Sequence, residues 1–212
     1  MKLSKRGAGF ILGHEAVYLE AYRDPVGIWT IGAGHTAAAG GIAPRAGMTL
    51  SFDQAMRIFA RDMRKFEGRV SRALKPEVIR LQHRFDALVS LDFNTGAIFK
   101  GTVDDKLNRG DVQAAMATVN AYVNAGGRRL GGLVKRRREE VALFLHGRYP
   151  RRKILLKDRA RSQGRLIDPA RIPWNGGDAI PLDLDQPIPP IPIRRPKQNF
   201  LIDLLKLIWR SL

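Results

Sequence analysis

The stretch His14–Thr36, HEAVYLEAYRDPVGIWTIGAGHT, decides how the rest of this 212-residue chain is interpreted. Its middle part, Asp24–Gly27, consists of residues that favour turns. The following Ile28–Ile31 is β-branched and aromatic, which favours an extended strand. The stretch therefore predicts a turn that leads directly into a strand.

Two carboxylates and a hydroxyl stand around this turn. We expect Glu15 at the end of a first helix that is capped by Ser4, Asp24 at the turn and Thr30 on the strand. Two carboxyl groups that face one another across a groove can hydrolyse a glycosidic bond, because one protonates the leaving oxygen while the other activates water or attacks. On spacing alone, the two acids would more commonly be solvated surface residues.

The residues around the two acids resemble the catalytic motif of the phage-type lysozymes, which are the endolysin muramidases of glycoside hydrolase family 24. The resemblance lies in Glu15, Ala21–Gly27, Trp29–Gly32 and Gly34–Thr36. That family has a glutamate, a downstream aspartate and a threonine on the next strand at this spacing. The resemblance therefore implies catalytic roles for Glu15, Asp24 and Thr30.

Two later segments, Gln82–Gly96 and Gly126–Arg137, also resemble this family, although the family usually has proline where Gly131 stands. The implied fold is α+β and mainly α. It is a two-lobed, lysozyme-like fold in which a small N-terminal β-hairpin or sheet and a helical C-terminal lobe are joined by a long helix.

Helical periodicity agrees with this fold. Ser51 and Gln54 form a capping-box signal for one long helix that runs to about Leu74. Further helices are expected over 76–93, 102–109, 111–123 and 134–146. The last of these is expected to bury Val141, Phe144 and Leu145.

Four further residues are candidate substrate ligands. Gly32 and Gly34 would share one strand face and leave a flat floor for a sugar ring, unless they serve tight packing or a bulge. Arg136 and Arg137 would stand in the first turn of the last helix, where positive charge opposes the helix dipole. An anionic ligand would explain this charge, and a solvated face is the alternative. We expect His35 to make a structural hydrogen bond.

The net charge of +17 points to an anionic partner, such as nucleic acid, anionic lipid or a carboxylate-bearing wall polymer. No nucleic-acid recognition motif is found, so we expect no nucleic-acid partner. The chain has no cysteine, and the expected chemistry needs no metal and no organic cofactor. The apolar run Phe10–Leu12 is shorter than the roughly 7–15 residues of a signal peptide. We therefore expect synthesis in the cytoplasm and action in the periplasm or on the wall after another factor releases the protein.

Composition suggests three parts. Residues 1–149 would form the catalytic domain, 150–198 a proline-rich basic linker, and 199–212 an amphipathic helix. Residues 200–212 could lie on an anionic membrane surface. They could also pack against the catalytic lobe or a second copy.

The resulting hypothesis is an inverting hydrolase of the β-1,4 bond between N-acetylmuramic acid and N-acetylglucosamine in peptidoglycan glycan strands. Glu15 would be the general acid and Asp24 the base for a water that Thr30 orients, with the carboxyls about 6.5–9.5 Å apart. We expect a monomer. The alternatives are a lytic transglycosylase and a non-catalytic cationic protein that disrupts walls or membranes through its charge and C-terminal helix.

Overall fold

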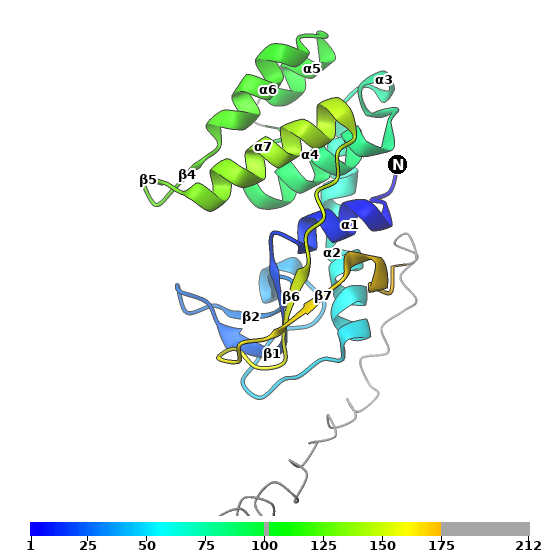
Figure 1. Cartoon of the computed structure of the whole chain (residues 1–212). Coiled ribbons are helices and arrows are strands. Elements are labelled where there is room, and N and C mark those ends of the chain that lie inside the picture. Colours follow the sequence, from blue (N-terminus) through cyan, green and yellow to red (C-terminus); the bar gives the residue numbers. More distant parts are fainter. Residues whose placement is uncertain (100–101, 175–212) are drawn as a thin grey trace, which may run out of the picture.

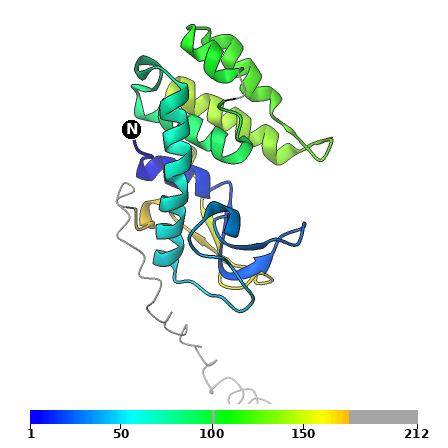
Figure 2. The same ribbon diagram turned by 180° about the vertical axis from the view of Figure 1, so that it is seen from behind.

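The computed structural model describes residues 1–99 and 102–174, which form two lobes joined by a long helix (Figures 1 and 2). One lobe contains a five-stranded sheet and the other contains helices α3 to α7. The connecting helix is α2, Phe52–Ala73. Ser51 and Gln54 form the reciprocal capping box at its start, so this prediction is confirmed.

The sheet lobe begins with α1 (Lys5–Leu12), β1 (Ala16–Arg23), β2 (Trp29–Gly32), β3 (His35–Thr36) and the short η1 (Ala37–Ala39). Helix α1 ends three residues before Glu15, so the prediction that Glu15 ends the helix is wrong. Gly13 is the C-cap of α1, and from Ala16 onward burial alternates with a period of two, as it does along a strand with one face on the core. Glu15 lies in the turn between the helix and the strand.

Residues after Tyr149 return to this sheet. Strand β6 (Ile154–Lys157) pairs in parallel with β1, and β7 (Arg165–Ile167) pairs antiparallel with β6, so the sheet order is β3-β2-β1-β6-β7. The short η2 (Pro169–Arg171) then contacts α1. A linker is therefore the wrong interpretation for residues 150–174, because their apolar side chains complete the core of the sheet lobe.

The helical lobe contains α3 (Pro76–Ile79), α4 (Gln82–Thr95), α5 (Val103–Asn108), α6 (Val112–Ala121), the small hairpin of β4 (Asn124–Ala125) and β5 (Arg128–Arg129), and α7 (Gly131–His146). The single helix expected over 76–93 is divided, because the backbone of Leu81 is extended. Gly96 ends α4 in the left-handed conformation.

Helix α7 differs from its prediction in two ways. It begins at Gly131, which places Arg136 and Arg137 in its second turn, so the argument from the first-turn dipole does not apply. Leu143 is buried in place of the expected Leu145, which is 40% exposed. Phe144 is buried as expected.

The predicted amphipathic helix over 199–212 and most of the predicted linker lie outside the described residues. Binding of residues 200–212 to an anionic membrane surface therefore stays a prediction. Within residues 1–99 and 102–174, none of the helices has both the length and the apolar character needed to cross a bilayer.

Candidate active site

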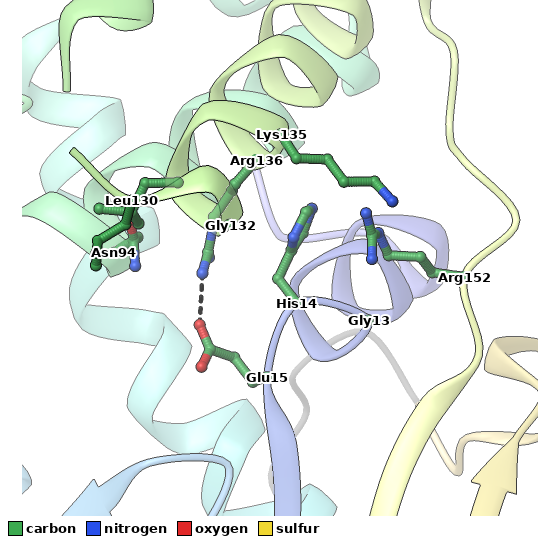
Figure 3. A pocket seen from close by; sticks show the side chains of 10 residues that line it. Gly13, His14, Glu15, Asn94, Leu130, Gly132, Lys135, Arg136 and Arg152 are labelled. Atoms are coloured by element: carbon green, nitrogen blue, oxygen red, sulfur yellow. Dashed lines mark hydrogen bonds and ion pairs between the residues drawn. The ribbon is translucent and has the colours of Figure 1, made fainter. Parts of the chain in front are cut away.

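Glu15 projects into a cavity of about 470 Å³ between the α1–β1 turn and the first half of α7 (Figure 3). We call this the Glu15 cavity. Its lining residues are Gly13, His14, Glu15, Asn94, Leu130, Gly132, Leu133, Lys135, Arg136 and Arg152. The side chain of Glu15 is 31% exposed, so its carboxylate is accessible to a ligand in this cavity.

Arg136 holds the Glu15 carboxylate. Its Nη1 donates to Oε1 of Glu15 at 2.5 Å, and Figure 3 shows the two side chains pointing toward one another from opposite walls. The side chain of Arg136 is only 4% exposed. Arg136 was expected to bind substrate, whereas in the structure it forms an ion pair with the candidate acid Glu15.

A buried network fixes Arg136 in turn. Its Nε donates to Glu140 at 3.2 Å, and Glu140 also accepts from the hydroxyl of Ser90 at 2.6 Å. Arg137 donates to Glu140 at 3.1 Å and to Asn94 at 2.9 Å. Arg137 is fully buried and does not line the Glu15 cavity, so the structure does not bring it together with the other candidate ligands.

Burial sets the pKa shifts within this network. Burial raises the pKa of Glu140, although the charges of Arg137 and Arg136 and the hydroxyl of Ser90 oppose the shift. Burial lowers the pKa of Arg137, which the charge of Glu140 counteracts. Each charge is thus desolvated but has an opposite charge in contact, the arrangement that buried ionic groups require. Sequence analysis missed Glu140 and Ser90.

Asp24 is positioned by the backbone of its own turn. Its Oδ1 accepts from the N–H groups of Val26 at 3.0 Å and Ile28 at 2.8 Å. The main chain of Asp24 also bonds to Ile28 and Gly27, which closes the turn. Within the described part of the chain the other carboxylate oxygen has no hydrogen bond, so it is available to accept one from water or a ligand.

Tyr22 lies close enough to respond to both candidate carboxylates. Burial raises the pKa of Tyr22, and the neighbouring Tyr18 and the negative charges of Asp24 and Glu15 raise it further. Tyr22 is on β1 opposite Thr30 of β2, two residues before Asp24 in the sequence and on the same strand that Glu15 precedes. The negative charges of both carboxylates therefore act on the Tyr22 phenol, although neither Asp24 nor Thr30 lines the Glu15 cavity.

Thr30, Gly32 and Gly34, the other residues predicted from the motif, do not line the Glu15 cavity. Thr30 is 4% exposed, and its hydroxyl donates to the carbonyl of Ile28 at 3.2 Å. Gly32 is buried at the end of β2, whereas Gly34 is in the two-residue turn to β3, so the prediction that they share a strand face is wrong. Their φ angles of 63° and 85° belong to the left-handed region, so the turn itself requires glycine. Neither glycine lines the Glu15 cavity.

His14, beside Glu15, belongs to an ionic chain that the sequence analysis did not identify. Its Nε2 lies 3.0 Å from Glu139, which receives two hydrogen bonds from Arg152 at 3.0 and 2.7 Å. Burial lowers the pKa of His14 to about 4, assisted by the positive charges of Arg136 and Arg152 and opposed by Glu139. Arg152 follows the segment that was expected to be the whole catalytic domain, so its place beside Glu15 depends on the return of the chain to the sheet.

His35 makes the expected structural contacts. Its Nδ1 is 2.7 Å from Asp62 of α2, and its Nε2 is 2.9 Å from the carbonyl of Ile42. The ring is 2% exposed, so it ties the β2–β3 hairpin to the long helix.

Comparison with known proteins identifies the family of this chain. The family model for phage lysozyme matches residues 13–140, which include Glu15, Asp24 and the Arg136–Glu140 network. The chain belongs to the phage lysozyme family. The endolysin of Salmonella phage P22 is 36% identical over 147 residues, covering 68% of this lysozyme and 99% of the relative. The endolysin of Bacillus phage B103 is 33% identical over 151 residues, covering 69% of this lysozyme and 55% of the relative.

Solved structures give the same result. The endolysin of Escherichia coli O157:H7 phage FAHEc1 matches with a TM-score of 0.63 at 33% identity, over 71% of this lysozyme and 97% of that chain. The muramidase domain of SpmX from Asticaccaulis excentricus matches with a TM-score of 0.60 at 29% identity, over 68% of this lysozyme and 97% of that chain. This lysozyme is thus a glycoside hydrolase that acts on the peptidoglycan of the cell wall.

Proposed function

We propose that this lysozyme hydrolyses the β-1,4 bond between N-acetylmuramic acid and N-acetylglucosamine, with Glu15 as the general acid and Asp24 as the base. The observation that supports the proposal is the carboxylate of Glu15, which is 31% exposed and lines a cavity of about 470 Å³. A cavity of this size can accommodate a sugar ring, and glycoside hydrolysis needs one carboxyl group on each side of the scissile bond.

The hydrogen bonds support different roles for the two acids. The backbone N–H groups of Val26 and Ile28 orient one oxygen of Asp24 and leave the other to accept a proton from water. Arg136 holds the carboxyl group of Glu15 from the opposite wall of the cavity, which both residues line. A protonated Glu15 would then donate to the leaving oxygen, while water activated by Asp24 attacks the anomeric carbon from the opposite side.

Thr30 would assist Asp24. Its hydroxyl donates to the Ile28 carbonyl and can therefore accept a hydrogen bond from the attacking water. Replacing Thr30 by Ala should lower the rate of wall lysis, and an unchanged rate would leave Thr30 a purely structural residue.

Digestion of purified peptidoglycan tests the acid. Glu15→Gln should reduce the release of reducing ends by at least about 100-fold, because general acid catalysis typically contributes that much. Glu77→Gln is the matched control, since Glu77 is exposed on α3 in the other lobe and should leave the rate unchanged. Full activity in purified, folded Glu15→Gln protein would disprove the assignment.

The products distinguish the proposed reaction from its alternatives. An inverting hydrolase releases the α-anomer of a reducing muramic acid end, which NMR detects immediately after cleavage. An anhydro sugar would instead identify a lytic transglycosylase. Lysis that survives Glu15→Gln but is lost when residues 200–212 are removed would identify a non-catalytic cationic activity.

A further inference from the structure

The contact between Arg136 and Glu15 works against the role proposed for Glu15. A general acid has to carry a proton before it can donate one, whereas a guanidinium that contacts a carboxyl group favours its ionised form. Arg136 makes this contact through Nη1 and is almost fully buried, so water screens its charge only weakly (Figure 3). A second negative charge is therefore needed near Arg136 if Glu15 is to act as an acid.

Glu140 lies on another edge of the same guanidinium. Its side chain is 2% exposed, and its Oε1 accepts from Nε of Arg136 at 3.2 Å. One planar guanidinium thus contacts two carboxylates, of which only Glu15 lines the Glu15 cavity. Because a substrate in that cavity does not reach Glu140, any effect of Glu140 on the reaction has to pass through Arg136.

The contacts of Glu140 favour its charged form. Nε of Arg137 lies 2.9 Å from its Oε2, and the hydroxyl of Ser90 donates to its Oε1 at 2.6 Å. Burial raises the pKa of Glu140, and the charges of Arg137 and Arg136 and the hydrogen bonds oppose this effect. The two arginines and two glutamates form a cluster whose formal charges cancel when both glutamates are ionised. Protonation of Glu15 leaves one net positive charge in the cluster.

The other titratable groups around Glu15 do not supply a negative charge. Lys135 and Arg152 line the Glu15 cavity and are cationic. Burial lowers the pKa of His14 to about 4, so its ring is neutral above that pH. Tyr22 is neutral as well, because burial and the nearby tyrosine and carboxylates raise its pKa.

Two further carboxylates lie in this region but are directed elsewhere. Asp24 does not line the Glu15 cavity. Glu139 receives two hydrogen bonds from Arg152, so its charge is taken up by that pair. Within residues 1–99 and 102–174, Glu140 is the one carboxylate besides Glu15 that forms an ion pair with Arg136.

We propose that Glu140 is a positioning residue that offsets the charge of Arg136, so that Glu15 can carry a proton while the guanidinium holds it in place. This inference rests on the proposed function, because only an acid catalyst needs that proton. Removing the charge of Glu140 should make Glu15 lose its proton at a lower pH, and removing the charge of Arg137 should have the opposite effect. A purely structural role predicts no such pair of opposite shifts.

Titration of the Glu15 carboxyl carbon by ¹³C NMR in the full chain tests the proposal, with Glu15→Gln identifying its signal. Glu140→Gln should move the midpoint to lower pH by about 1 pH unit, as the loss of one charge across a guanidinium gives at an effective dielectric constant of about 20. Arg137→Gln should move it to higher pH. The double variant Arg137→Gln/Glu140→Gln, whose charges balance again, should titrate like the unaltered chain. The alkaline limb of kcat/KM against pH should move with each midpoint.

Two controls separate charge from packing. Ser90→Ala removes a hydrogen bond to Glu140 without changing any charge, and Glu77→Gln makes the same substitution at an exposed position of α3. Both should leave the midpoint unchanged. An unmoved midpoint in Glu140→Gln, or a shift of equal size in Ser90→Ala, would overturn the proposal. If Glu140→Gln does not fold, Arg137→Gln decides, and a midpoint that stays in place or falls in that variant would overturn the proposal.

The outcomes also distinguish this inference from the proposed function. Midpoints that fail to move overturn the inference alone, because the NMR signal reports the protonation of Glu15 whether or not Glu15 is the acid. Midpoints that move as stated, while the rate profile stays in place, overturn the assignment of Glu15 as the acid and the inference with it.

Discussion

Leu156→Ala is the substitution that most directly tests whether residues after Tyr149 belong to the folded core. Leu156 is on β6, is 0% exposed and pairs with the sheet between β1 and β7. Leu166 on the neighbouring β7 is 63% exposed and provides the same substitution in solvent. The two variants differ in burial but not in chemistry.

The expected cost follows from the burial. The substitution removes three carbon atoms, and at about 0.8 kcal/mol each the lost transfer free energy is about 2.4 kcal/mol. The remaining cavity raises the total to about 2.5–5 kcal/mol, depending on how far β1 and α2 relax around it. For a chain of this size that loss lowers Tm by about 5–20 °C. Leu166→Ala should change the free energy of unfolding by no more than about 0.5 kcal/mol.

Urea unfolding followed by circular dichroism measures both variants. The predicted result is a clear fall in the midpoint for Leu156→Ala with an unchanged slope, and no shift for Leu166→Ala. If both variants unfold like the unaltered chain, β6 does not contribute to the core and the catalytic unit ends near Tyr149. A loss of equal size in both would show that burial is not the cause.

Three further predictions concern other parts of the sheet lobe. Burial lowers the pKa of His35, but the hydrogen bonds to Asp62 and Ile42 and the charge of Asp62 raise it by more. The stabilisation from this pair is therefore complete below about pH 6.5 and is lost as pH rises through the raised pKa. Asp62→Asn should accordingly lower the free energy of unfolding by roughly 1–3 kcal/mol at pH 5.5 and by less at pH 9 in urea unfolding, and a pH-independent loss would contradict the ion pair. Gly34→Ala should cost about 1–2 kcal/mol because φ is 85° there, whereas Gly131→Ala at the start of α7 should cost nothing; equal Tm values for the two would refute the strain. NMR titration of His14 should give a midpoint near its pKa of about 4, and a midpoint near 6.5 would place the ring in solvent.

Local signals explain why much of the fold could be predicted. Ser51 and Gln54 specify the start of α2 through contacts three residues apart, and Gly96 specifies the end of α4 through its backbone conformation. The turn at Asp24 is likewise closed by a hydrogen bond from Ile28, which is only four residues further along the sequence. In each case the partners are close in sequence, so their pattern is visible without the tertiary structure.

The predictions that were wrong concern contacts between residues that are far apart in the sequence. Pairing of Ala16 with Leu155 joins distant parts of the chain, and no residue near either strand specifies it. The alternation along β1 and the apolar run Ile154–Leu156 were available signals, but the charged and proline-rich surroundings hid the second. Arg136 and Arg137 could not be distinguished by sequence, because only the packing of α7 on α4 decides which of the two reaches Glu15 and which is enclosed.

The return of the chain to its first sheet has a mechanical consequence. The backbone crosses between the lobes at α2 and again after α7 (Figure 1). This second crossing is bound to the helical lobe by the hydrogen bonds of Tyr149 to Asp86 and of Arg152 to Glu139. The two lobes are therefore connected by two segments of the chain rather than by one. A motion that separates the lobes would have to deform both connections, so the position of Arg136 relative to Asp24 depends on two segments of the chain and not on the bending of α2 alone.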